Sequence, residues 1–278
     1  MKLTVLVDNN TLIDRYFVGE PAVSYLVEDG DTRLLFDVGY SEAFLANARR
    51  MGIDLRRLDW VVLSHGHIDH TGGLDALCRL YAEAALERQP ASPPTLVAHP
   101  CALLSRAYDD LTEAGTFLSE DKLRRQFTMR LSRDPIALTD RMFFLGEIPR
   151  PFEFERAAPK GRVWGASGEE PDHILDDTAI ACRTAQGLVV LSGCAHAGIC
   201  NTIEHARAVT GESRVAGVIG GFHLQKAPVD RLARTGEYLA SLGLATVHAC
   251  HCSDLEAKIA LAGHVGIGEV GVGMVMEF

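Results

Sequence analysis

Short apolar runs alternate with longer amphipathic stretches along most of the chain, a pattern that is typical of an α/β protein. In the first half, strands are expected at residues 3–7, 22–27, 33–38, 60–63 and 95–98. The polar turn EDGD at 28–31 predicts a hairpin between two of them. Helical spacing predicts helices at 41–51 and 75–88, the first capped by Ser41 and ended by Gly52.

The second half repeats this alternation more regularly. Strands are expected at 179–184, 188–191, 215–219, 246–249 and 270–276, and helices at 199–209, 229–242 and 253–262, the last capped by Ser253. Residues 108–168 are interrupted by prolines and predict one clear strand, at 141–145. We expect residues 1–278 to form a single domain in which this irregular 108–168 segment serves as a lid or substrate wall.

Histidines and a carboxylate are concentrated in one loop, directly after the apolar run at 60–63. The stretch WVVLSHGHIDHTGGL presents His65, His67, Asp69 and His70 within six positions. Imidazole and carboxylate groups suit zinc, iron or manganese. In an extended loop alternate residues point the same way, so His65 and His67 can hold one ion. Asp69 and His70 follow the turn and can face a second ion.

Three further histidines, His196, His223 and His251, each follow a predicted strand of the second half. In a layered α/β fold, loops at one edge of the sheets gather residues from distant parts of the sequence. By position, His196 is expected to complete the first metal site and His251 the second. His223 is expected to bind substrate or donate a proton, with a ligand role as the alternative.

The string H-x-H-x-D-H after an apolar strand resembles the signature of the metallo-β-lactamase superfamily. The stretches DNNTL, LLFDVG, GEIPRPFEFE, LSGCAHAGICNTIEHA, VIGGFHL, HCSDLEAKIAL and VGVGMVMEF are similar to one subfamily, over nearly the whole chain. That subfamily includes dihydropterin-methyl-ribofuranosyl-aminobenzene phosphate synthases. The resemblance implies an α/β fold, a metallo-β-lactamase-like αββα sandwich of two mixed sheets with outer helices.

The resemblance also implies roles for individual residues. Asp37, in LLFDVG, is expected to support the metal loop from behind the ligands, with turn capping as the alternative. Most members of the superfamily place an Asp where this chain has Cys194. Either the Cys194 thiolate supplies a ligand, Asp176 or Asp177 reaches in from the neighbouring strand, or water alone bridges the ions.

Composition restricts the partners. The net charge of −10 argues against a nucleic-acid backbone as the main partner, whereas a local basic pocket containing Arg150 can receive a small anionic substrate. Neither a secretion signal nor an apolar run of membrane-spanning length is evident, so we expect a cytoplasmic protein without membrane contact. The seven cysteines lack paired spacing, which argues against structural disulfides. Self-association into a homo-oligomer stays open.

Together these features predict a metal-dependent hydrolase of an ester or phosphoester. Two divalent ions, zinc in the first place and iron or manganese otherwise, would share a hydroxide that attacks the substrate. Asp69 would orient this nucleophile and shuttle a proton. Two alternatives stay open. The first is a synthase that joins a dihydropterin diphosphate to an aminobenzene ribofuranosyl phosphate and releases pyrophosphate. The second is a non-catalytic metal or ligand sensor.

Overall fold

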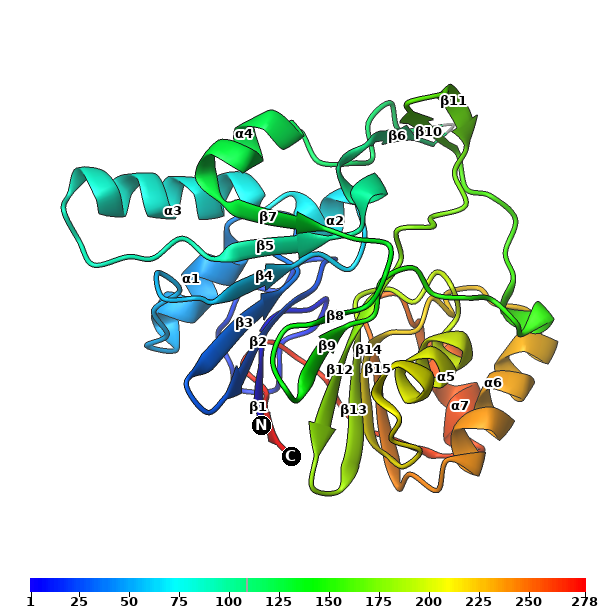
Figure 1. Cartoon of the computed structure of the whole chain (residues 1–278). Helices are drawn as coiled ribbons and strands as arrows, with labels where there is room; N and C mark the ends of the chain where they lie inside the picture. Colours follow the sequence, from blue (N-terminus) through cyan, green and yellow to red (C-terminus); the bar gives the residue numbers. More distant parts are fainter. Residues whose placement is uncertain (109) are drawn as a thin grey trace. The chain divides into compact units, whose positions relative to one another are not determined.

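The structure is a computed structural model that describes residues 1–108 and 110–278, and it divides into two compact units. Unit 1 consists of Met1–Ser132, Pro159–Asp176 and Gly271–Glu277, and unit 2 of Arg133–Ala158, Asp177–Val270 and Phe278. Each unit contains one seven-stranded sheet with its own helices (Figure 1). The predicted α/β class with two mixed sheets and helices is therefore confirmed. Residue 109, within the predicted 108–168 segment, lies outside the described residues.

The sheet of unit 1 has the strand order β17-β1-β2-β3-β4-β5-β7. Its strands are β1 (Lys2–Val7), β2 (Ser24–Asp29), β3 (Thr32–Phe36), β4 (Trp60–Val62), β5 (Thr95–Ala98), β7 (Thr128–Leu131) and β17 (Val275–Glu277). Pairing is antiparallel from β17 to β3 and parallel from β3 to β7. A separate three-stranded sheet joins β6 (Ser105–Ala107), β10 (Arg162–Gly165) and β11 (Gly168–Pro171).

Helices pack against this sheet because their apolar faces need a partner. They are α1 (Ala43–Arg50), α2 (Ile68–Thr71), α3 (Leu74–Leu86), α4 (Glu120–Gln126) and the 3₁₀ turn η1 (Pro100–Leu103). Phe44 of α1 and Leu77 of α3 are fully buried in one core cluster with Leu35 and Val61 of the sheet. The helical turn α2 falls where the sequence predicts only a loop, since four residues are too few to show a helical period.

Unit 2 repeats this succession of pairings. Its sheet has the order β16-β15-β14-β13-β12-β9-β8, with β8 (Ile136–Ala137), β9 (Met142–Phe144), β12 (Ala179–Thr184), β13 (Gly187–Ser192), β14 (Val215–Gly221), β15 (Thr246–Cys250) and β16 (Gly266–Ile267). Pairing is antiparallel from β8 to β13 and parallel from β13 to β16. Three helices, α5 (Ile199–Thr210), α6 (Val229–Ser241) and α7 (Leu255–Ala262), and the 3₁₀ turn η2 (Glu153–Glu155) complete the unit (Figure 1).

Four further local predictions differ from the structure. The N-cap residue of α1 is Glu42, not Ser41, although the Ser41 hydroxyl accepts a hydrogen bond from the Ala43 N–H at 3.1 Å. The described part of 108–168 contains α4 and several short strands, whose two to four residues are too few for a sustained period. Asp254, not Ser253, caps α7: its Oδ1 accepts a hydrogen bond from the Ala257 N–H at 2.9 Å. The last predicted strand is shortened to β17. No helix in the described ranges is long and apolar enough to cross a membrane.

His248 of unit 2 should make the free energy of unfolding depend on pH. Burial lowers the pKa of His248 in β15, against an opposing backbone contact from Glu269. The folded protein therefore keeps this ring neutral at a pH where the unfolded chain, with a histidine pKa of about 6.5, takes up a proton. The free energy of unfolding should fall as the pH drops below about 6.5.

Urea unfolding at a series of pH values measures this effect. His248→Gln should flatten the acid side of the curve, because the side chain no longer titrates. His173→Gln, at an exposed position, is the matched control and should run parallel to the wild-type protein. An unchanged acid slope in His248→Gln would contradict the assignment.

Candidate metal centre

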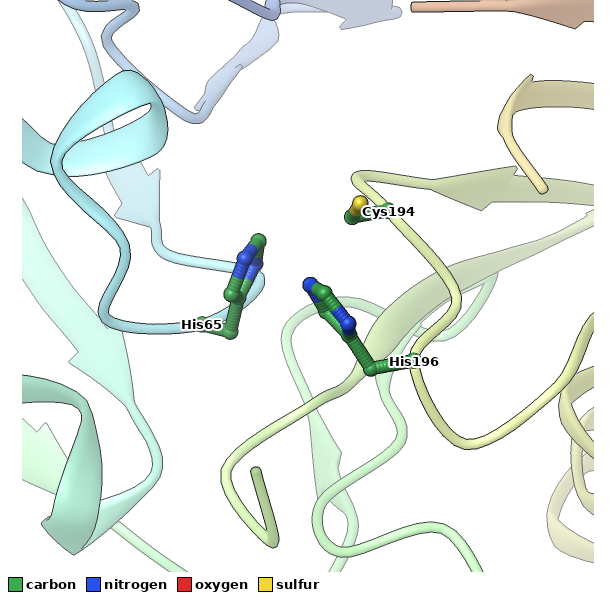
Figure 2. A group of neighbouring side chains, drawn as sticks. All are labelled: His65, Cys194 and His196. Carbon is green, nitrogen blue, oxygen red and sulfur yellow. The ribbon is translucent and has the colours of Figure 1, made fainter. Parts of the chain in front are cut away.

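In unit 1, two imidazoles face each other on the loop that follows β4. His65 Nε2 and His67 Nδ1 lie 2.8 Å apart, and both side chains are buried. Figure 2 shows the His65 ring projecting from this loop. The backbone is extended at His67 and then enters α2, where the Thr71 hydroxyl donates to the His67 carbonyl at 3.0 Å. Two buried ring nitrogens thus converge on one point, as metal ligands do.

Asp37 holds this loop from the end of β3. Its Oδ1 accepts from the Ser64 N–H at 2.7 Å, and its Oδ2 accepts from the Ser64 hydroxyl at 2.6 Å. The same Oδ2 lies 2.7 Å from His70 Nδ1, so it orients that ring and favours a proton on Nδ1. His70 Nε2 then carries the lone pair and lies 3.6 Å from Asp69 Oδ2. Asp37 therefore contacts both Ser64 of this loop and the His70 ring.

A second carboxylate, Asp176, supports the loop from another direction. Its Oδ2 accepts from the Gly66 N–H at 2.7 Å and from Arg106 Nη2 at 3.0 Å. The neighbouring loop passes so close that a Cβ on Gly66 would lie 2.3 Å from the Ala102 carbonyl oxygen. Burial raises the pKa of Asp176, but the charges of Arg106 and His67 and the backbone hydrogen bonds together outweigh it, so the net pKa is lowered. Asp176, one alternative for a bridging ligand, therefore contacts the loop backbone and Arg106.

Arg106 is a residue that the sequence reasoning missed. It is fully buried on β6, where its guanidinium also donates to the Cys101 carbonyl at 2.9 Å and lies 3.4 Å from Asp172. Nothing in the local sequence distinguishes it from a surface arginine, because its acidic partners follow more than sixty positions later. A buried charge must be paired, and the two aspartates provide that pairing.

The surroundings of His67 keep its ring neutral. Burial and the Arg106 charge lower the pKa of His67 to about 3, although Asp69 and Asp176 act in the opposite direction. The Tyr108 hydroxyl contacts its Nε2. With the proton on Nε2, the ring presents the Nδ1 lone pair towards His65. A neutral imidazole with an accessible lone pair is the form that binds a metal ion.

Unit 2 gathers a different set of side chains. Cys194 and His196 lie on the loop after β13 (Figure 2), and the rings of His196 and His223 have centroids 4.1 Å apart. Cys194 Sγ donates to Cys252 Sγ at 3.0 Å and lies 3.4 Å from His223 Nδ1. Cys252 is not among the predicted site residues. Its position beside His251 in the stretch CHC is the signal that could have identified it.

Charge and hydrogen bonding act strongly on Cys252. Burial raises the pKa of its thiol, but hydrogen bonds from Cys194 and His223, together with the charge of His251, hold it well below its ordinary value. The backbone N–H of His223 also donates to Cys252 Sγ at 3.1 Å. The lowered pKa of this half-buried thiol favours the thiolate, the form that binds metal ions.

Among the remaining predicted residues of unit 2, His251 also belongs to this group, because its ligand atom lies within 4.8 Å of Cys194 Sγ. Asp177 Oδ2 accepts from the Ala197 N–H at 2.8 Å and so fixes the loop that carries His196. His251 directly follows β15, with a left-handed φ of 50°. Arg150 is half-buried, and its carbonyl accepts from Arg156 Nε at 3.1 Å. The structure thus groups Cys194, His196, His223 and His251.

Because Asp176 holds the histidine loop and pairs with Arg106, we expect its substitution to destabilise the protein. Asp176→Asn should lower the free energy of unfolding by about 3 kcal/mol, because it removes a buried negative charge that pairs with Arg106. Chemical unfolding of the metal-free protein measures the loss. The control is Asp75→Asn, which removes an exposed pair with Arg79 and should cost less than about 1 kcal/mol. Equal losses in the two variants would refute the supporting role.

Comparison with known proteins identifies the family. The model of the metallo-β-lactamase superfamily matches residues 18–175. A 7,8-dihydropterin-6-methyl-4-(β-D-ribofuranosyl)-aminobenzene-5'-phosphate synthase of Methanocaldococcus jannaschii is 31% identical over 93% of this chain and 89% of its own length. The crystal structure of Tm1679, described as a metal-dependent hydrolase of the β-lactamase superfamily, aligns with a TM-score of 0.83 at 29% identity, over 100% of this chain and 99% of Tm1679.

A more distant structure shares the fold. Zn²⁺-bound PqqB from Methylobacterium extorquens aligns over 100% of both chains with a TM-score of 0.55, at 13% identity. Such low identity supports the fold alone. The family match and the synthase relative go further, because they cover more than half of the chain. The chain belongs to the metallo-β-lactamase superfamily.

Proposed function

We propose that the chain is a metal-dependent hydrolase of a small anionic ester or phosphoester. The observation that carries this proposal is the buried imidazole pair of His65 and His67, whose opposing ring nitrogens lie 2.8 Å apart. The proposed ligands of two divalent ions are those predicted from the sequence: His65, His67, Asp69, His70, His196 and His251. Family membership supports a divalent metal in general.

The donor chemistry of unit 1 fits such ions. Three imidazoles and one carboxylate are borderline nitrogen and oxygen ligands, which suit zinc first and iron or manganese next. Asp37 contacts His70 Nδ1, which leaves His70 Nε2 oriented to bind a metal ion. When bound, divalent ions would acidify water and polarise the electrophilic oxygen of the substrate.

The side chains of the protein supply the remaining chemistry. Asp69 keeps about a third of its side chain exposed and lies 3.6 Å from His70 Nε2, so its carboxylate can orient water and transfer a proton. His223 is proposed to bind substrate or donate a proton to the leaving group. Arg150 is proposed to attract the anionic group of the substrate, since a guanidinium matches phosphate geometry.

A synthase is the second candidate, and a specific finding favours it. The relative that is 31% identical over nearly the whole chain is named as a synthase. In such a reaction an amine-bearing aromatic ring would replace the diphosphate of a dihydropterin, and pyrophosphate would leave. The same residues would serve, with Asp69 accepting a proton from the nucleophile and Arg150 binding a phosphate.

Substitution of the imidazole pair tests the metal-dependent reading. His65→Ala/His67→Ala should lose the ions held by the imidazole and carboxylate ligands, and at least about a thousandfold in activity, because these ions provide most of the charge stabilisation. Elemental analysis of protein purified without added metal gives the first quantity. A panel of phosphomonoesters, phosphodiesters and carboxylic esters gives the second. His173→Ala, at an exposed position, is the control and should keep both.

Full activity in the metal-free double variant would end the proposal. The two reactions are then separated by product analysis. Pyrophosphate release that requires both a dihydropterin diphosphate and an aminobenzene ribofuranosyl phosphate would favour the synthase. Cleavage of simple esters without a second substrate would favour the hydrolase.

A further inference from the structure

We propose that Cys194, His223 and Cys252 form a binding site for a thiophilic metal ion, Zn²⁺ or Cu⁺, within unit 2. The three ligand atoms lie within 4.8 Å of one another. The site uses none of the six ligands proposed for the hydrolase ions, although it shares His223 with the proposed reaction. It also gives the Cys194 thiolate a role as a metal ligand. The sequence analysis left that role open as one of three alternatives.

Sheet topology brings the three ligands together. The strands β13, β14 and β15 are neighbours, run parallel, and pair Ser192 with Gly220 and Gly221 with Cys250. Each ligand lies two residues beyond the end of its strand: Cys194 after Ser192, His223 after Gly221, and Cys252 after Cys250. Because parallel strands end at the same edge, the equal offset places the three side chains next to one another.

The packing leaves room for the thiols where a side chain would block them. A Cβ on Gly221 would lie 2.7 Å from Cys252 Sγ and 3.1 Å from the Cys194 Cα. The missing side chain lets Cys252 approach Cys194 to a sulfur–sulfur distance of 3.0 Å. The His223 ring completes the group at 3.4 Å from Cys194 Sγ. Gly221 therefore allows two thiols and an imidazole to share one small space.

The backbone at these loops is held in a costly conformation. Ala195, His223 and His251 have φ values of 50°, 49° and 50°, in the left-handed region that non-glycine residues rarely adopt. One such residue lies on each of the three loops, either next to a ligand or as the ligand itself. Local strain of this kind persists where the surroundings enforce it, and it concentrates at functional sites.

The ligand chemistry differs from that of unit 1. Two thiolates and one imidazole are soft ligands, which select Zn²⁺ or Cu⁺ over Mg²⁺ and Mn²⁺. The His and Asp group on the loop after β4 contains no sulfur. A metal ion bound to the cysteines should therefore give a thiolate spectrum that ions bound to unit 1 alone cannot give.

Cobalt substitution tests the site. The reduced full-length protein is titrated with Co²⁺, and the thiolate-to-cobalt charge-transfer absorption is recorded. We expect a band that Zn²⁺ abolishes. Cys252→Ser should reduce the band by about half or more, and His223→Gln should weaken Co²⁺ binding by at least about tenfold. Gly221→Ala should weaken it as well, since the new methyl group displaces Cys252 while all ligands remain.

Two controls define the outcome. Cys101→Ser removes a half-buried thiol of unit 1 and should leave the band unchanged. His65→Ala/His67→Ala should keep the band while losing activity, which separates this site from the proposed function. Circular dichroism verifies that each variant is folded.

Three results would overturn the proposal. The first is a full band in folded Cys252→Ser. The second is the absence of a band in wild-type protein whose thiols are all reduced. In that case Cys194 and Cys252 would be a hydrogen-bonded thiol pair and not metal ligands. The third is loss of the band in the His65 and His67 variant, which would show that the thiolates bind metal only together with those imidazoles.

Discussion

Neighbouring parallel strands must end at the same edge of a sheet, and the candidate chemistry of this protein depends on that constraint. In unit 1, β3 leads to Asp37 and β4 leads to the histidine loop. In unit 2, β13, β14 and β15 lead to Cys194, His223 and Cys252. Residues that are distant in sequence meet because the backbone hydrogen bonds of each sheet fix where its strands stop.

Polar residues behind the loops make these strand ends rigid. Asp37 fixes Ser64 and His70, while Asp176 joins Gly66 to the buried Arg106. Burying these charges is costly unless every one is paired, so the network is stable only in one arrangement. That arrangement directs the ring nitrogens before any ion binds, which lowers the cost of assembling a metal site.

The two units carry different ligand chemistries on the same strand pattern. Unit 1 offers imidazole and carboxylate, whereas unit 2 adds two thiols next to an imidazole. Membership of the metallo-β-lactamase superfamily establishes the fold and agrees with divalent metal ions. It leaves the reaction open, because one fold supports many chemistries and the side chains of the site decide among them.

The sequence by itself determined the α/β class, most strands and helices, and the histidine loop, because apolar periodicity and a dense ligand string are local signals. It missed the turn at Ile68–Thr71, the cap at Asp254 and the roles of Arg106 and Cys252. Only the tertiary structure decided these features. Arg106 contacts its aspartates, and Cys252 contacts Cys194, although the partners are far apart in the sequence. Such contacts depend on how strands pair in space, and no local pattern encodes that pairing.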